Sequence, residues 1–202
     1  MSIPLPPQPA FGEPLPTVAS PETLAFLARR RSASALLLSA PAPNAAEVRD
    51  LIALAARVPD HGKLAPWRFI VMEGKGKAAL AEELMALAAK RSDATKANAA
   101  LGKFRSPPLA ICVVSRVVEG DIPAWEQELS AGAVCMTLLN AALAMGFGAN
   151  WITDWYSVDE EAKAAAGIAP DERVAGYIYI GRSCEPPQER VRPDIDRLIT
   201  RL

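Results

Sequence analysis

Two short segments of the sequence gather side chains that could bind a charged ligand. The first runs from Arg29 to Ser32 and contains three arginines and a serine at the expected end of a helix. Guanidinium groups bind phosphate through paired hydrogen bonds and stay charged in proteins. A cationic run also stabilises the negative end of a helix, so a solvated charge cluster is the alternative interpretation. The residues alone leave both interpretations open.

The second segment is the loop from Pro59 to Trp67, in which Asp60, His61 and Lys63 lie close together in sequence. Prolines near both ends restrict its backbone, and polar loops between rigid elements often carry binding residues. A capped turn followed by a buried tryptophan would use the same residue types. The sequence therefore predicts a candidate binding loop and leaves its ligand open.

Other kinds of site find little support in the sequence. His61 is the single histidine, and the cysteines Cys112, Cys135 and Cys184 are far apart, with no CxxC pair. We therefore expect neither a metal site nor a disulfide framework, and reduced thiols favour a cytoplasmic protein. No GxGxxG motif follows a predicted strand, and the segment 74–77 lacks the spacing of a phosphate loop.

Composition and charge narrow the class of protein further. The chain has 202 residues, with 22 Lys+Arg, 23 Asp+Glu and a formal net charge of −1, and half of its residues are apolar. This balance argues against a nucleic-acid partner and favours a folded single domain. The stretch between Glu128 and Asp154 carries no charge, but its glycines and the absence of flanking Lys or Arg disfavour a membrane span. A helix buried on all sides, as in a dimer core, fits that stretch better.

Local signals indicate the elements that position these residues. Proline-rich residues 1–20 are expected to form an extended arm, and residues 21–202 a single domain with a C-terminal arm from about residue 183. Ser20 and Asn44 are typical helix caps. We predict helices over 21–31, 44–58, 77–91, 126–145 and 159–166, strands over 69–72, 109–115 and 174–180, and a polar helix or loop over 93–104. The strands are too far apart in sequence to form hairpins, which favours an α+β fold with a small central sheet flanked by helices.

Four motifs in order make the chain resemble the nitroreductase family, and its short branch of NAD(P)H nitroreductases in particular. They are the Arg-Arg-Ser segment, the Pro-Asp-His loop closing in Pro66-Trp67-Arg68-Phe69, the run from Trp125 to Gly132, and Gly146-Phe147-Gly148. The resemblance covers about Leu24 to Gly181. It implies a nitroreductase-like fold and a homodimer with two FMN sites at the interface, each built from both chains.

The resemblance also implies a set of cofactor-binding residues. The set comprises Arg30, Arg31, Ser32, Arg57, His61, Lys63, Trp151, Ile152, Thr153 and Arg182. The Arg-Ser positions match those that bind the FMN phosphate in the family. Arg57 and His61 match positions that contact the flavin in the short branch, and Asp60 and Lys63 are expected to approach from the second subunit.

The chain departs from the family pattern at several of these positions. Ala65 stands where members often have glutamine, and Ile152 stands where the short branch often has an arginine. We treat Arg182 as a candidate replacement for that arginine. Ser34 and Ala35 also stand where many members carry a lysine or arginine.

The function implied by the resemblance is that of an FMN-dependent oxidoreductase. It would pass electrons from NAD(P)H to a nitroaromatic, quinone or similar small acceptor by a ping-pong mechanism. No side chain need act as a general acid, because water or the flavin can supply protons. The aromatic side chains that could line the acceptor pocket are Trp125, Phe147, Trp151 and Trp155. The alternatives are an FMN-binding or storage protein and another reaction of this fold, such as dehalogenation.

Overall fold

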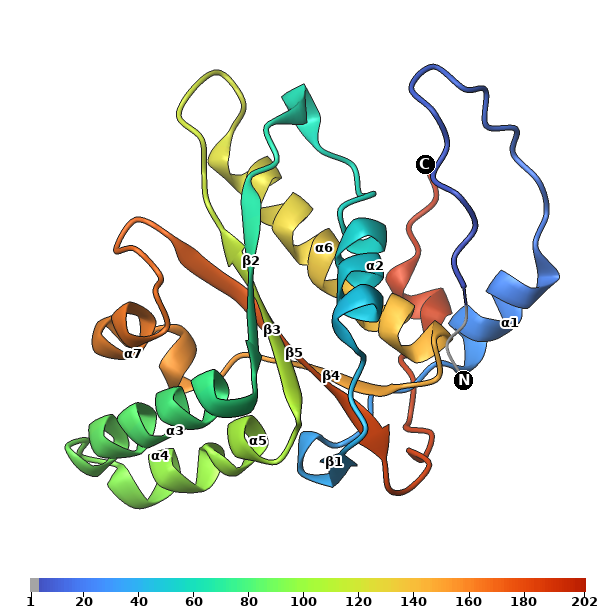
Figure 1. Cartoon of the computed structure of the whole chain (residues 1–202). Helices are drawn as coiled ribbons and strands as arrows, with labels where there is room; N and C mark the ends of the chain where they lie inside the picture. Colours follow the sequence, from blue (N-terminus) through green and yellow to red (C-terminus); the bar gives the residue numbers. More distant parts are fainter. Residues whose placement is uncertain (1–3) are drawn as a thin grey trace.

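The computed structural model describes residues 4–202, and a small antiparallel sheet lies at its centre (Figure 1). Within these residues, strands pair in the order β1-β5-β3-β2, and β4 also pairs with β5. All of these pairings are antiparallel. The strands are β1 (Leu38–Ser39), β2 (Trp67–Glu73), β3 (Leu109–Ser115), β4 (Gly148–Ile152) and β5 (Arg173–Ser183).

Helices cover both faces of this sheet. The α-helices of the described residues are α1 (Pro21–Arg29), α2 (Ala45–Ala55), α3 (Gly74–Ala89), α4 (Ala94–Ala100), α5 (Gly102–Arg105), α6 (Ala124–Ala144) and α7 (Glu160–Ala165). The 3-10 helices are η1 (Ala35–Leu37), η2 (His61–Lys63), η3 (Trp155–Ser157) and η4 (Ile195–Leu198), and neither α1 nor η4 buries a residue. Helices α2 and α6 pack on one face with Ile178 and Ile180, and α3, α4, α5 and α7 pack on the other with Tyr177 and Tyr179. Side chains alternate along a strand, so successive residues of β5 reach different layers.

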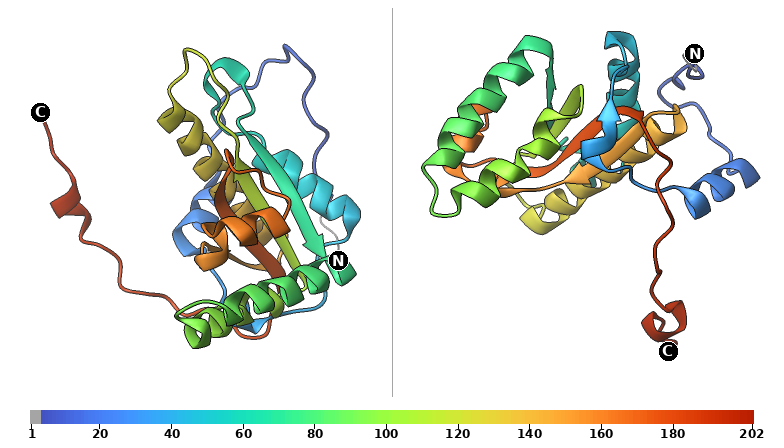
Figure 2. Two further views of the ribbon diagram at one scale, coloured as in Figure 1. Left: turned by 90° about the vertical axis from the view of Figure 1, so that its left-hand side faces the viewer. Right: turned by 90° about the horizontal axis from the view of Figure 1, so that it is seen from below.

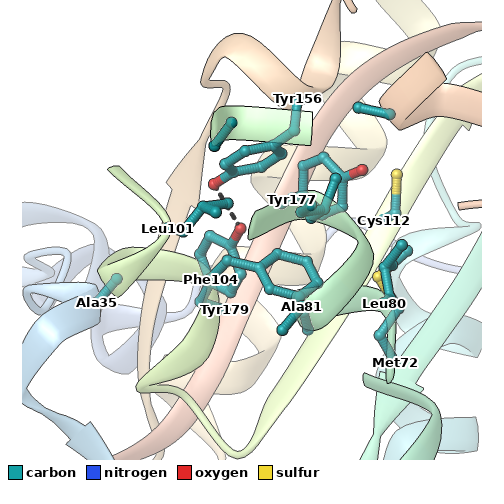
Figure 3. Packing of buried hydrophobic residues seen from close by; sticks show 14 of the residues in the cluster. Ala35, Met72, Leu80, Ala81, Leu101, Phe104, Cys112, Tyr156, Tyr177 and Tyr179 are labelled. Atoms are coloured by element: carbon teal, nitrogen blue, oxygen red, sulfur yellow. Dashed lines mark hydrogen bonds between the residues drawn. The ribbon is translucent and has the colours of Figure 1, made fainter. Parts of the chain in front are cut away.

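An aromatic cluster fills the core on the side of α3, α4 and α5 (Figure 3). The hydroxyl oxygens of Tyr156 and Tyr179 share a hydrogen bond of 2.8 Å, and Phe104 lies edge-on to Tyr156. The bond satisfies two hydroxyls that would otherwise be costly to bury. Burial also raises the pKa of the neighbouring Cys112 to about 12, so this thiol is a core residue and not a nucleophile.

The α+β prediction and the central sheet flanked by helices are confirmed. Helix α2 begins with a capping box in which Asn44 accepts from the Glu47 amide and the Glu47 carboxylate accepts from the Asn44 amide. Helix α6 begins at Ala124 and covers nearly the predicted range. Helix α1 ends at Arg29, two residues before the predicted end, so Arg30 and Arg31 lie in the extended segment that follows it.

Three local predictions differ from the structure. Strands β1 and β4 were not predicted, because short segments that contain glycine, asparagine or serine carry little strand signal by themselves. Both are held by pairing with β5, which is distant in sequence. Helix α3 begins at Gly74 instead of about Lys77. The segment 93–104, predicted as a polar helix or loop, forms the two short helices α4 and α5, which agrees with that prediction.

The described residues before α1 and after β5 lie outside the two helical layers. Residues 4–20 form no helix or strand and are mostly exposed, while the remaining residues of the predicted arm, 1–3, lie outside the described residues. The segment after β5 is exposed, contains η4, and leads away from the body of the molecule (Figure 2). Over residues 4–202, none of the helices combines the length and hydropathy that a membrane span requires.

Candidate functional site

The segment after α1 runs beside β4 and places the predicted phosphate-binding residues there. The amide of Ala33 donates to the carbonyl oxygen of Ala149 at 3.0 Å, and the side-chain amide of Asn150 donates to the carbonyl oxygen of Ala33. These contacts fix the backbone directly after Arg30, Arg31 and Ser32. The segment therefore lies next to β4, the strand that carries Trp151 and Ile152.

Arg30 is half-buried and only partly satisfied. Its Nη2 atom donates to Ser32 Oγ at 3.4 Å, whereas its Nε is buried and has no hydrogen-bond partner within the described part of the chain. A buried donor without a partner is costly, so its presence indicates a missing acceptor. Arg31 Nε donates to the carbonyl oxygen of Gln188 at 2.9 Å, which brings the C-terminal segment to the same place.

The C-terminal segment adds two further arginines to this cluster. Burial lowers the pKa of Arg30, and the positive charges of Arg192, Arg31 and Arg190 lower it further. The carboxylate of Glu189 offsets this in part and lies 2.9 Å from Arg192 Nη2. Four guanidiniums thus gather around one unpartnered donor, and such a cluster suits a multiply charged anion such as a phosphate. We refer to Arg30, Arg31, Arg190 and Arg192 as the arginine cluster.

Sequence reasoning missed Arg190 and Arg192. They lie about 160 residues after Arg30 in a segment with little regular structure, and only the folded chain brings them there. The available signal was the density of arginines that follows the predicted last strand.

Strand β4 presents Trp151 and Ile152 to opposite faces of the sheet. Ile152 is partly buried and packs against the core on the side of α3 to α5. Trp151 is partly exposed, and its indole Nε1 donates to the carbonyl oxygen of Ala175 at 3.2 Å. Thr153 follows the strand and is exposed.

We expect Gly176→Ala to destabilise the fold and displace Trp151. The indole of Trp151 lies so close over Gly176 that an added Cβ would overlap Trp151 Nε1. Such overpacking costs about 1–3 kcal/mol, which corresponds to a fall in Tm of roughly 2–12 °C for a chain of this size. Thermal unfolding followed by circular dichroism measures the effect. Gly76→Ala in α3 is the matched control, since no atom lies within 4 Å of its added Cβ. An unchanged Tm for Gly176→Ala would contradict the expectation.

The strand register does not bring Arg182 to the position of Ile152. Arg182 pairs with Ser39 on β1, whereas Ile152 pairs with Tyr177, five residues earlier on β5. Five residues span about 16 Å along a strand, and residues at odd spacing point to opposite faces. Arg182 and Ile152 therefore lie apart within one chain, and the assignment of Arg182 to the cofactor stays a prediction.

The loop between α2 and β2 carries the other predicted site residues. The carboxylate of Asp60 accepts from the amides of Leu64 and Ala65 at 3.2 and 2.8 Å, so it caps the loop from within. Gly62, Lys63 and Ala65 have positive φ angles of 75°, 56° and 46°. Non-glycine residues seldom adopt this conformation, and it is frequent at functional sites.

Arg57 and His61 contact different neighbours. Arg57 is exposed, and its Nη1 donates to Gln8 Oε1 at 3.3 Å. His61 Nδ1 lies 2.7 Å from Glu126 Oε2 in the first turn of α6. Lys63 is exposed. Within one chain, this loop lies at the upper end of Figure 1 and the segment after α1 at the lower right, so the two groups of predicted residues are apart.

The aromatic side chains named as candidate pocket residues do not gather at one place. Trp125 is exposed at the start of α6, and Phe147 packs beside the core on the α6 side. Trp155 packs on the opposite side of the sheet, where Arg91 lies 4.9 Å from its ring. Within one chain, Trp155 and Trp125 therefore lie in different places. A groove of about 330 Å³ does join Trp125 to Pro59, His61, Glu126 and Leu129.

Comparison with known proteins places this fold and these motifs in one family. The sequence model of the Nitroreductase family matches residues 27–182 of this chain. The chain is 35% identical over 163 residues to the Escherichia coli K12 protein named "Putative NAD(P)H nitroreductase YdjA", covering 79% of this chain and 87% of that protein.

Solved structures show the same fold. A nitroreductase-like family protein from Bacillus cereus has a TM-score of 0.79 at 19% identity, over 94% of this chain and 99% of the other. A nitroreductase with bound FMN from Bacteroides fragilis has a TM-score of 0.69 at 18% identity, over 91% and 100%. The resemblance drawn from the sequence motifs is confirmed, and the chain belongs to the nitroreductase family.

Proposed function

We propose that the protein is an FMN-dependent oxidoreductase that passes electrons from NAD(P)H to a nitroaromatic, quinone or similar acceptor. The observation that carries the proposal is the arginine cluster, in which a buried donor of Arg30 has no partner among residues 4–202. A phosphate dianion supplies the missing acceptor and offsets the crowded positive charge. The relatives reported above include one named "Putative NAD(P)H nitroreductase YdjA" and one solved with FMN, which supports this choice of anion.

The residues around the cluster fit the rest of the cofactor. We assign the phosphate to Arg30, Arg31 and Ser32 together with Arg190 and Arg192. Trp151 and Thr153 on and after β4 lie beside the same segment and are assigned to the flavin, while the side chain of Ile152 faces the core and contributes its backbone. The C-terminal segment is part of the site in this assignment, because Arg31 holds it through the carbonyl group of Gln188.

We propose a homodimer, because the loop residues and the arginine cluster, which are both assigned to the site, lie apart within one chain. Arg57, His61 and Lys63 of one subunit would then meet the arginine cluster of the other. The half-buried face of α6 supports this pairing, because Gly132, Met136 and Leu143 recur there at helical spacing. Above Gly132, no atom lies within 4 Å of an added Cβ, so a second backbone can approach closely.

The division of labour between cofactor and protein is simple. FMN held by these residues would supply the redox chemistry, namely hydride acceptance and two-electron transfer to an acceptor. The protein binds the phosphate through the arginine cluster and orients the ring beside β4. Arg57 carries a permanent positive charge, so we assign it to stabilise the negative charge of the reduced ring.

A visible absorption spectrum of the purified protein tests the proposal most directly. We expect a flavin spectrum that bleaches when NADH or NADPH is added without oxygen, and that returns when a quinone is added. A colourless protein that FMN does not reconstitute would overturn the proposal. A flavin spectrum that stays unbleached would favour the alternative of an FMN-binding or storage protein.

A further inference from the structure

His61 and Glu126 form a close pair between two segments that are distant in sequence. His61 Nδ1 lies 2.7 Å from Glu126 Oε2, and the two side chains are 63% and 30% exposed. Surface ion pairs of this kind contribute little to stability. The geometry of the pair is therefore more informative than its energy, because a carboxylate at Nδ1 decides which ring nitrogen is left for other partners.

The backbone on both sides of this pair is held in place. Ser130 Oγ on α6 donates to the carbonyl oxygen of Pro59 at 2.8 Å, and the Asp60 carboxylate ties the loop to its own later amides. A Cβ at Gly62 would lie 3.3 Å from Ile122, the residue just ahead of α6, so the turn packs closely on that segment. The imidazole thus stands on a fixed loop beside a fixed helix.

The pair borders a groove suited to a flat apolar compound. The groove of about 330 Å³ is lined by His61 and Glu126 and, within one chain, by the exposed side chains of Trp125 and Leu129. These two residues share the side of α6 that carries Gly132 and Met136, so in the proposed homodimer the groove opens toward the partner subunit. Large exposed apolar side chains that flank a few polar groups are typical of a small-molecule site. With Nδ1 occupied by Glu126, the Nε2 atom of His61 is the nitrogen available to a molecule in the groove.

We propose that the groove receives the electron acceptor, that His61 Nε2 gives it a proton, and that Glu126 is the positioning residue for His61. This inference rests on the proposed function. For a quinone, the overall balance is quinone + NAD(P)H + H⁺ → hydroquinone + NAD(P)⁺. The nicotinamide hydride brings two electrons and one proton. The imidazolium form of His61 delivers the second proton from Nε2 to a quinone oxygen and keeps its Nδ1 proton toward Glu126, and solvent then protonates Nε2 again. For a nitro compound, the same balance yields a nitroso compound and water.

The first test measures the tautomer of His61. The histidine ring signals need no residue assignment, because the chain has one histidine. Nitrogen-15 NMR at a pH where the ring is neutral is expected to show the proton on Nδ1 in the holoprotein. Glu126→Gln is expected to lose this preference. Glu128→Gln, which removes the same charge two residues away, is expected to keep it, since Glu128 pairs with Arg173. The same tautomer in all three proteins would overturn the proposal.

The second test separates the two halves of the reaction by stopped-flow spectroscopy of the holoenzyme. Glu126→Gln is expected to reoxidise with a quinone about tenfold more slowly near pH 7, a modest part of what general acids contribute. Bleaching by NAD(P)H is expected to be unchanged, and Glu128→Gln is expected to match the wild-type protein in both halves. Glu126→Asp, which keeps the carboxylate, is expected to restore part of the rate.

The outcomes distinguish this inference from the proposed function. If Glu126→Gln bleaches with NAD(P)H and reoxidises as fast as the wild-type protein, the pair has no role in proton transfer. The proposed oxidoreductase function would still stand. Failure of the wild-type protein to bleach would instead count against the proposed function. The NMR result stands by itself in either case, because it reports on His61 and Glu126 without turnover.

Discussion

Replacing Arg30 with alanine is expected to weaken FMN binding by about 10- to 150-fold. A hydrogen bond to a charged group contributes about 1.5–3 kcal/mol, and each 1.4 kcal/mol corresponds to a factor of ten. Arg30 is half-buried, and its Nε has no partner within residues 4–202, so the loss falls mainly on the cofactor, apart from the long hydrogen bond of Nη2 to Ser32. Fluorescence titration of the apoprotein with FMN measures the change in Kd.

Arg29→Ala is the matched control for this prediction. Arg29 is exposed at the end of α1, one residue from Arg30, and its removal changes the net charge by the same amount. We expect its Kd to change much less. Arg192→Ala is expected to resemble Arg30→Ala in direction, because its charge acts on Arg30. Full flavin occupancy of Arg30→Ala after gel filtration would contradict the assignment of the arginine cluster.

The elements predicted well are those whose signals are local. The Asn44 and Glu47 capping box and the following apolar spacing are enough to begin α2 correctly. The uncharged stretch that becomes α6 is long, and β3 is a continuous apolar run whose residues are all buried. Such features can be recognised without knowing the partner element, because helix caps and hydrophobic periodicity depend on residues close in sequence.

The elements missed are those that depend on distant partners. Strand β4 exists because Gly148 to Ile152 pair with β5, and the close contact of Trp151 with Gly176 is a consequence of that register. The register of strand pairing decides which side chains point to each face of the sheet. That register depends on a distant partner strand, so the sequence of the strand alone does not reveal it.

The candidate-site residues likewise fall into those that the sequence indicates and those that only the structure brings together. The Arg-Ser segment and the Pro-Asp-His loop are visible as dense polar motifs, and the family resemblance supplied their roles. The approach of Arg190 and Arg192 to Arg30, and of Glu126 to His61, joins residues far apart in the chain. These contacts required the folded structure, and the assignment of each residue to FMN stays a prediction until it is measured.

Glu172→Gln is expected to destabilise the protein by about 3 kcal/mol at neutral pH. The buried Glu172 carboxylate accepts two hydrogen bonds from Arg68 at 2.7 and 2.6 Å and one from the Ala169 amide at 2.9 Å. The bonds from Arg68, and then the one from Ala169, lower the pKa of Glu172 from 4.5 to about 2. At about 1.4 kcal/mol per pH unit, the charged form is favoured by about 3 kcal/mol, or roughly 6–12 °C in Tm. Glutamine resembles the protonated acid and loses this contribution.

The pH dependence of stability distinguishes this ion pair from a general loss of packing. Because the folded state lowers the pKa of Glu172, its contribution is complete above pH 4.5 and falls away as the pH drops toward 2. Urea unfolding at pH 7, 4 and 2.5 is therefore expected to show a gap between wild type and Glu172→Gln that narrows as the solution becomes acidic. Arg173→Ala, which breaks the exposed pair with Glu128, is the control and is expected to cost less than about 1 kcal/mol. A gap that stays constant with pH would assign the destabilisation to packing and not to the charge of Glu172.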